Sequence, residues 1–282
     1  MTASIPATVR RARDAVEARS ARVPYRVKLG LVWIVIFVVL AGLFLSYGFD
    51  TQFMLEWAPY ILRGTGITLI VCVASIVLAT TLALFGALCR LSKNPLLNGP
   101  ASFYVSFIRG TPLIVQIFFV YLAFPQLARF APSYMSGFFL LDAIPAATLA
   151  LGVNYGAYMT EIFRAGIQSV GHGQIEAAHA LAMSPGQTTR RIVLPQAVRT
   201  VIPPVGNEFI AMLKDSALVS FIGATDLFFR ASKVGQQNFR ALETLVIAAA
   251  VYWLLTSIFS FFQSRLERKM AVGYVRETTH GH

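Results

Sequence analysis

The side chains of this chain that could do chemistry are polar and charged groups placed inside long apolar stretches. They are Arg109, Gln116, Asn154, Glu161, Glu208, Lys214, Asp215 and Ser216. Charged groups are costly inside a membrane, so they line a water-filled path or pair with one another. Lys214 and Asp215 are adjacent, and adjacent side chains on one helix point about 100° apart. Each of the two therefore needs another partner. They are candidates for a solute path, but ion pairs with neighbouring spans that hold the helix bundle together are the more usual way to tolerate such charges.

The cysteines, histidines and glycines do not form a recognisable catalytic site. Cys72 and Cys89 lie within one apolar stretch, where they are interpreted as small apolar residues and not as a disulfide. His172 and His179 lack the spacing of a metal site. The sequence contains no G-x-x-x-x-G-K-[ST] motif, the loop that cradles the phosphates of ATP. We therefore expect that this chain is not an enzyme and binds no cofactor itself.

The composition is typical of a membrane protein. Of the 282 residues, 56% are hydrophobic and only 13% are charged, whereas a soluble domain carries about 25% charged residues. The net charge of +11 could fit a nucleic-acid partner. However, the Lys and Arg residues cluster at the ends of apolar segments, as they do in membrane proteins. We therefore predict an all-α polytopic membrane helix bundle and no nucleic-acid partner.

Six apolar segments approach or exceed the roughly 20 residues that a membrane-spanning helix needs. The predicted spans are residues 29–47, 62–88, 102–124, 144–163, 201–223 and 242–263. Pro112 should kink the third span. The fifth span opens with Pro203 and Pro204 and carries several polar residues, so we expect a broken helix beside a water-filled path. Residues 224–241 are predicted to form an amphipathic outer segment.

Small residues recur at helical spacing in two of these spans. They are Ser75, Ala79, Ala83 and Ala87 in the second span, and Gly152 and Gly156 in the fourth. Such stripes let two helices approach closely, although in an Ala-rich helix the spacing can also arise by chance. Glu161 and Arg164, at i and i+3 near the end of the fourth span, are predicted to pair locally.

The distribution of positive charge predicts the orientation. Of the 24 Lys and Arg residues, 18 lie on the side of the N-terminus and five on the other side. Cytoplasmic segments carry the excess of positive charge, so both termini are predicted to be cytoplasmic. The basic N-terminal tail is expected to be attracted to membrane lipid.

A polar, basic loop at residues 173–204 separates the fourth and fifth spans. Residues 175–183 are strong helix formers and predict one short helix. Ser184 is placed as the N-cap of a second, with Gln187 closing a capping box. This second helix is expected to end at Leu194 and Pro195. The result is a rigid, mostly apolar knob that suits a socket on another protein.

Motifs in and around this loop carry a family resemblance. Glu176, Ala177 and Ala178, followed by Ile192, Leu194 and Pro195, resemble the EAA motif of the membrane subunits of ABC importers. The supporting motifs are Arg109–Gln116, Ala157–Arg164, Leu194–Ala197 and Leu213–Ser216. Over residues 63–266 the chain is similar to the polar amino acid permease branch of this family. It departs from the family at Ala182, where glycine is usual.

The resemblance implies a division of the chain. The predicted parts are a basic cytoplasmic tail (1–28), an additional N-terminal transmembrane helix (29–49), a five-span type I transmembrane domain (62–266) and a cytoplasmic tail (267–282). It also implies location in the bacterial inner membrane. The implied partners are two ATPase subunits that hold ATP and Mg²⁺, a second permease chain, identical or different, and an extracytoplasmic amino acid-binding protein.

The resemblance further implies roles for individual residues. The loop would dock into the ATPase through Glu176, Ala177, Ala178, Ala182, Ile192, Leu194 and Pro195. The intramembrane polar residues would line the path of a polar amino acid, because its ammonium and carboxylate groups both need polar partners. The sequence leaves open which amino acid that is. An ATP-independent secondary transporter or channel is the alternative, although only one interrupted span is apparent and such carriers usually have two.

Overall fold

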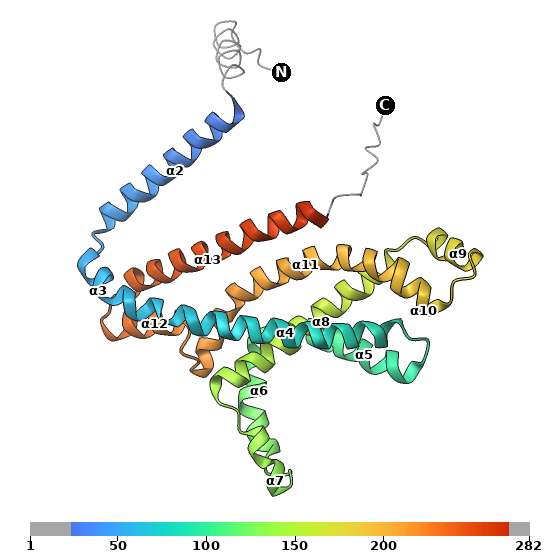
Figure 1. The fold of residues 1–282 in the computed structure, drawn as a ribbon. Helices are drawn as coiled ribbons and strands as arrows, with labels where there is room; N and C mark the ends of the chain where they lie inside the picture. The colour runs from blue at the N-terminus through green and yellow to red at the C-terminus, as the bar shows by residue number, and fades with distance from the viewer. Residues whose placement is uncertain (1–23, 271–282) are drawn as a thin grey trace, which may run out of the picture. The chain divides into compact units, whose positions relative to one another are not determined.

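The computed structural model describes residues 24–270, and this part of the chain is helical with no strand. Most of the predicted basic tail (1–28) and most of the predicted C-terminal tail (267–282) lie outside the described residues. The chain divides into two compact units, Met1–Gln52 and Phe53–His282. The observed architecture is the predicted all-α one (Figure 1).

The first unit contains α2 (Tyr25–Tyr47), which corresponds to the predicted N-terminal span. Its apolar side chains are exposed on every side, and Leu31, Val35 and Val39 are each more than half exposed. A helix that is apolar all round requires an apolar environment, such as lipid. α2 therefore has the surface of a transmembrane helix.

The second unit is built on α4 (Gly64–Leu91) and α8 (Ala143–Gln168), which α3 (Thr51–Leu62) precedes. Ser75, Ala79 and Ala83 are fully buried on α4. A Cβ atom added to Gly156 of α8 would lie 2.8 Å from the Tyr104 hydroxyl oxygen and 3.0 Å from Leu82 Cβ. The predicted stripes of small residues are thus confirmed as a close helix contact, and the chance explanation is wrong.

The predicted third span is not a single kinked helix. It consists of α5 (Pro95–Arg109) and α6 (Leu113–Leu127), whose directions differ by 109°. Pro112 lacks an N–H group and disfavours helical angles in the residue before it, so the helix stops instead of kinking. Arg109 is therefore the last residue of α5 and does not lie one or two turns inside a span.

The segment after α6 returns the chain to α8 through short elements. These are α7 (Ser133–Ser136) and a 3₁₀ turn (Gly137–Phe139). α5 itself begins with a cap, because the Asn94 side chain accepts a hydrogen bond from Leu96 N at 3.0 Å.

The predicted fifth span begins earlier than expected and changes its helix type. α11 (Leu194–Asp215) runs straight through Pro203 and Pro204 and then becomes a 3₁₀ helix (Ser216–Ile222). Gly223, with a φ of 87°, ends it. The predicted broken helix is thus not seen: the span is helical throughout and changes from α to 3₁₀ geometry after Asp215.

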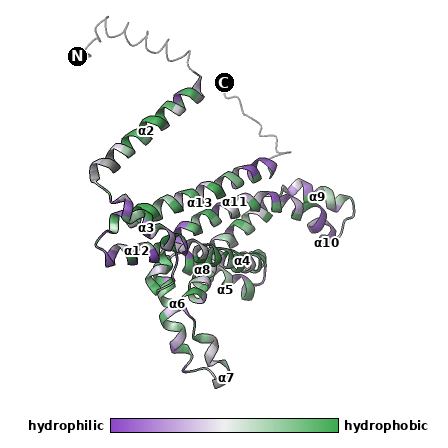
Figure 2. Cartoon of the chain, turned by 60° about the vertical axis from the view of Figure 1, so that its left-hand side comes forward, coloured by the Kyte–Doolittle hydropathy of each residue, from purple (hydrophilic) through white to green (hydrophobic). Residues whose placement is uncertain are grey.

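The last two helices are α12 (Leu227–Gln237) and α13 (Ala241–Met270). α12 is amphipathic as predicted, and it buries Leu227, Ala231 and Val234. Figure 2 shows apolar residues along most of α13 and polar residues at its last turns and over the loop between α8 and α11. Helix α13 extends to Met270, a few residues into the predicted tail.

Two described stretches are long and apolar enough to cross a membrane, Thr51–Leu91 and Ala241–Met270, and the bent pair α5–α6 makes up to three. α8 and α11 contain 26 and 22 residues, which is about 39 and 33 Å of helix. Both exceed the roughly 30 Å hydrocarbon core of a bilayer, but they carry more polar residues. A helix or bent helix pair is thus present at each of the six predicted spans, and the two most polar ones line the site described next.

Candidate functional site

The loop between α8 and α11 has the predicted helical structure at its start. It contains α9 (His172–Ala180) and the short α10 (Pro185–Thr188). Ser184 Oγ accepts a hydrogen bond from Gln187 N at 3.3 Å, and Gln187 Oε1 accepts one from Ser184 N at 2.9 Å. The predicted capping box is confirmed, and it fixes the direction in which the chain enters α10.

The end of this second short helix differs from the prediction. Instead of stopping at Leu194 and Pro195, the chain continues through a π-helical turn (Thr189–Val193) directly into α11. The ring of Pro195 would clash with the carbonyl of Arg191 in a regular α-helix. A wider π turn moves that carbonyl away, so the helix continues without a break.

Ala182 occupies the turn between α9 and α10 in a left-handed conformation, with a φ of 54°. Met183 N donates to Ala178 O at 3.1 Å and Ala182 N donates to His179 O at 2.9 Å. This pair of bonds is a Schellman motif, whose left-handed position is usually glycine. The turn therefore has glycine-type geometry with alanine in place, at a cost of roughly 1 kcal/mol or more.

The predicted docking residues divide into two groups. Glu176, Ala177, Ala182, Leu194 and Pro195 are exposed and Ile192 is half-buried, so their side chains are available to a partner. Ala178 is only 2% exposed and packs inside the loop, so it supports the knob and does not form its surface. Leu181 is 78% exposed at the turn. Leu181 is not among the predicted docking residues, although a leucine between two polar short helices is a detectable signal in the sequence.

A polar cavity of about 380 Å³ lies between the break after α5, the middle of α8 and α11. Its lining residues are Thr111, Pro112, Leu113, Asn154, Tyr155, Tyr158, Glu208, Ala211 and Asp215. The Tyr155 hydroxyl donates a hydrogen bond to Asp215 Oδ2 at 2.8 Å. Asn154 and Asp215, which are 61 positions apart in the sequence, are therefore brought to one cavity.

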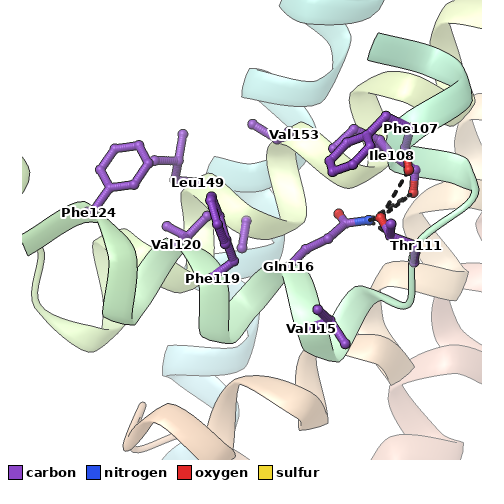
Figure 3. Close-up of a pocket in the computed structure, with 11 residues that line it drawn as sticks. Phe107, Ile108, Thr111, Val115, Gln116, Phe119, Val120, Phe124, Leu149 and Val153 are labelled. Atoms are coloured by element: carbon purple, nitrogen blue, oxygen red, sulfur yellow. Dashed lines mark hydrogen bonds between the residues drawn. The ribbon is translucent and has the colours of Figure 1, made fainter. Parts of the chain in front are cut away.

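Gln116 holds the break between α5 and α6 against α8. Its amide nitrogen donates to Ile108 O and Thr111 Oγ1, both at 2.8 Å, and its Oε1 accepts from Asn154 Nδ2 at 3.0 Å. Figure 3 shows this amide beside an apolar cavity of about 290 Å³ lined by phenylalanine and aliphatic side chains. Gln116 thus borders the polar cavity through Asn154, and its hydrogen bonds fix the break between α5 and α6 to α8.

The three remaining path candidates near α11 and α5 have different positions. Arg109 places its guanidinium 5.1 Å from the centre of the Tyr158 ring, a cation–π contact at the edge of the polar cavity. Lys214 is exposed and lines neither cavity. Ser216 is fully buried and donates to Leu213 O at 2.8 Å. Lys214 and Ser216 therefore do not line the polar cavity with Asp215, because successive helical side chains point in different directions.

Glu161 does not line the polar cavity but is held by two arginines. Its Oε2 accepts from Arg164 Nη2 at 2.7 Å, which confirms the predicted local pair. Its Oε1 lies 3.1 Å from Arg90 Nη2 on α4, a partner that the sequence analysis did not identify. The alternative of a structural ion pair thus holds for Glu161. Within the described part of the chain it does not hold for Lys214 or Asp215, which form no ion pair.

The lining of the polar cavity is acidic, and one cation lies at its edge. Glu208 and Asp215 contribute carboxylates to the lining, while the guanidinium of Arg109 lies over the ring of Tyr158. Tyr155 and Tyr158 add aromatic faces, which attract cations. The cavity can therefore hold a small positively charged group, such as an ammonium.

A fully buried carboxylate lies outside the predicted spans, where α12 begins. Asp226 is fully buried, and its Oδ1 accepts from Phe229 N at 2.8 Å while its Oδ2 accepts from the Tyr252 hydroxyl at 3.2 Å. Burial raises the pKa of Asp226 to about 6, against the opposing effect of these hydrogen bonds. Leu227 N donates to Thr68 Oγ1 at 3.2 Å, which ties the same point to α4.

Comparison with known proteins places this architecture. The model of the binding-protein-dependent transport system inner membrane component family matches residues 75–272. The chain is 36% identical over 226 residues to the probable amino-acid ABC transporter permease protein YckA of Bacillus subtilis, covering 80% of this chain and 96% of that protein. It is 38% identical over 212 residues to the arginine transport system permease protein ArtQ of Bacillus subtilis, covering 75% and 93%.

Solved structures agree with this assignment. The chain matches one from the crystal structure of an amino acid ABC transporter with histidines with a TM-score of 0.70 and 36% identity, over 78% of this chain and 99% of that one. A chain of the MetNI methionine ABC transporter in an inward-facing conformation matches with a TM-score of 0.62 and 20% identity, which supports the fold alone. This chain belongs to the family of binding-protein-dependent transport system inner membrane components.

Proposed function

We propose that this chain is the membrane-spanning permease subunit of an ATP-driven ABC importer for polar amino acids. The observation that carries the proposal is that the loop with α9 and α10 lies between α8 and α11, the two helices that form most of the polar cavity. A force on the loop therefore acts directly on the cavity walls. An ATP-independent carrier or channel would have no use for this knob.

The energy would come from a separate ATPase. The partner subunits, two of them, would bind ATP and Mg²⁺, and this chain would bind no cofactor itself. A second permease chain and an extracytoplasmic amino acid-binding protein would complete the complex. With 18 of the 24 Lys and Arg residues on the side of the N-terminus, both termini and the loop would be cytoplasmic, where an ATPase is found.

The docking surface would be the exposed part of the knob: Glu176, Ala177, Ala182, Leu181 and Leu194. Small and apolar side chains such as these fill a groove on a partner, while the Schellman motif and the capping box keep the knob rigid. Ile192 and Ala178 would support this surface from inside the loop.

The substrate would enter the polar cavity. Its α-ammonium group suits the carboxylates of Glu208 and Asp215 and the faces of Tyr155 and Tyr158. The relatives have names that refer to different amino acids, arginine for ArtQ and L-cystine for TcyB of Bacillus subtilis. The shared feature is the amino acid backbone, and the acidic cavity would recognise its ammonium end.

The test is reconstitution of the chain with its ATPase and binding protein in liposomes, supplied with a mixture of the twenty protein amino acids. We expect ATP-dependent uptake, and we expect Leu181→Asp to abolish co-purification of the ATPase because it places a charge in the docking surface. Leu96→Asp is the matched control, since Leu96 is 81% exposed but lies outside the loop. Uptake by the chain alone without ATP, unaffected by Leu181→Asp, would show that the importer assignment is wrong.

A further inference from the structure

We propose that Glu161 is a positioning residue that joins α8 to α4 and α5, so that movement of the loop reaches the break beside the polar cavity. The proposal rests on the proposed function and adds a route by which ATPase movement reaches the cavity. It assigns to Glu161 a role in transmission and not in substrate contact.

The inter-helix network consists of Glu161, Arg90, Ser102 and Asn98, on three helices. Arg90 Nε donates to Glu161 Oε1 at 3.1 Å, and Arg90 Nη1 donates to Ser102 Oγ on α5. Ser102 Oγ donates to Asn98 Oδ1 at 2.9 Å, and Asn98 Nδ2 donates to Arg90 O at 2.7 Å. The bonds therefore form a closed circuit between α4 and α5, to which α8 is attached through one carboxylate.

Much of the remaining contact between α4 and α8 is made by small residues. Ala79, Ala83 and Ala87 are fully buried there, and Gly86 lies against Thr160. Van der Waals packing of small side chains has little directionality. Ser75 Oγ donates a neutral hydrogen bond to Thr148 O at 3.2 Å, far along both helices from Glu161. Charge-assisted hydrogen bonds are about twice as strong as neutral ones, so the network supplies the stronger directional connection, and it lies at the loop end of α8.

The position of the network suits transmission from the loop. Glu161 lies in the last two turns of α8, and only Ser169 to Gly171 separate α8 from α9. The side chains of Glu161 and Arg90 are 20% and 25% exposed, so the pair is only partly screened by water. A displacement of α9 would carry the end of α8 with it and pull on α4 and α5.

The far end of α5 leads to the cavity. α5 ends at Arg109, which contacts Tyr158, and the next residues form the break that Gln116 clamps against Asn154. α5 is a continuous helix of 15 residues that connects the network to this break. The loop is therefore linked to the cavity by two routes, α8 itself and the route through Glu161, Arg90 and α5.

Arg164 provides a matched control within the same site. It binds the other oxygen of Glu161, and its hydrogen bonds in the described part of the chain go to Glu161 and Gln168, both on α8. Arg164→Gln therefore removes a positive charge next to the same carboxylate and leaves the inter-helix bonds in place. Arg90→Gln removes the equivalent charge together with those bonds.

The experiment measures ATP hydrolysis by the complete reconstituted complex, normalised to assembled complex. The ratio of the rates with and without binding protein, loaded from a mixture of the twenty protein amino acids, is compared among variants. We expect Arg90→Gln and Glu161→Gln to lower this ratio by at least about fivefold, the lower end of typical coupling between two sites. The double variant Arg90→Gln/Glu161→Gln should have a ratio no lower than that of the single variant with the lower ratio. Both substitutions remove the same link, so their effects should not add.

Two further variants keep the test decisive. Arg164→Gln should leave the ratio within about twofold of the wild-type value. A change that small is below the roughly fivefold effect expected when coupling between two sites is lost. Ser102→Ala, which keeps every charge paired, should also lower the ratio. Equal losses in all variants, or a normal ratio in Glu161→Gln, would overturn the inference. A wild-type complex without stimulated ATPase activity would instead contradict the proposed function, so the two failures are distinguishable.

Discussion

The two ends of the helix bundle are held together by different kinds of interaction. At the loop end, next to α9, the carboxylate of Glu161 is balanced by two arginines and stays partly exposed. At the α12 end, the carboxylate of Asp226 is fully buried and satisfied by a backbone N–H and a tyrosine hydroxyl. The first arrangement compensates charge with charge, and the second relies on neutral donors.

The backbone packing also differs between the ends. Each end contains one non-glycine residue at positive φ, Ala182 in the loop and Phe239 between α12 and α13. Only the α12 end adds a close backbone contact, in which Gly64 lies against Asp226 and Leu227. The comparison identifies the α12 end as the tightly packed anchor of the bundle.

The strongest test of the anchor is Gly64→Ala. A Cβ at Gly64 would lie 2.6 Å from Asp226 O and 2.7 Å from Leu227 Cα, which are backbone atoms that cannot turn away. We expect a loss of unfolding free energy of about 3 kcal/mol, the upper end for overpacking, measured by chemical denaturation in detergent. Gly66→Ala on the same helix is the control, because its Cβ would meet nothing within 4 Å, and it should be neutral or stabilising by up to about 1 kcal/mol. Equal stability of the two variants would contradict the close contact.

The pH dependence of the unfolding free energy tests whether Asp226 is held by neutral hydrogen-bond donors and not by a positive charge. Its pKa is raised from 3.8 to about 6 in the folded chain, so between these values the folded state binds the proton more tightly than the unfolded state. The contribution of this group is fully present below about pH 4 and is lost as the pH rises through 6. It amounts to at most about 3 kcal/mol.

Asp226→Asn should remove this dependence while its amide oxygen still caps α12. The measurement is the unfolding free energy of wild type and variant between pH 4.5 and 7.5, and the quantity of interest is their difference. We expect wild type to lose stability relative to the variant as the pH rises. Parallel curves would show that Asp226 does not titrate as its burial implies.

The smallest expected effect concerns the strained turn. Ala182→Gly should stabilise the chain by about 1 kcal/mol, because glycine adopts positive φ without steric cost. Ala180→Gly, in the last turn of α9, is the control and should destabilise by up to about 1 kcal/mol. Thermal unfolding in detergent can resolve this difference in sign. A destabilised Ala182→Gly variant would mean that the turn is not strained and would weaken the comparison between the two ends.

The loop was predicted better than the cavity because its signals are local. Ser184 and Gln187 are three residues apart, and their reciprocal bonds can be inferred from that spacing alone. The continuation of the helix past Pro195 was missed, because a π turn that relieves the proline clash has no distinct sequence signal. At Pro112 the sequence predicts a kink, whereas the structure has a helix end. Contacts with neighbouring elements decide whether a proline bends or ends a helix, and these contacts cannot be inferred from local spacing.

The cavity could be predicted only as a set of candidates. Asn154 and Asp215 lie on it, Gln116 and Arg109 border it, and Lys214, Ser216 and Glu161 do not line it. Which side of a helix faces the path depends on its rotation, and that rotation is set by packing against other helices. Leu181 was not predicted because its exposure depends on the folded loop. Arg90 was not predicted because its partner, Glu161, is 71 positions away in the sequence.

The sequence by itself determined the all-α membrane architecture, the caps of the loop and the family motifs, because these depend on composition and on residues within a few positions of each other. The tertiary structure alone decided what each carboxylate does. Glu161 meets two arginines, Asp215 meets a tyrosine at a cavity and Asp226 meets neutral donors in a buried site. The environment of a charged group is created by residues distant in the chain, and the free energy of that group depends on those neighbours.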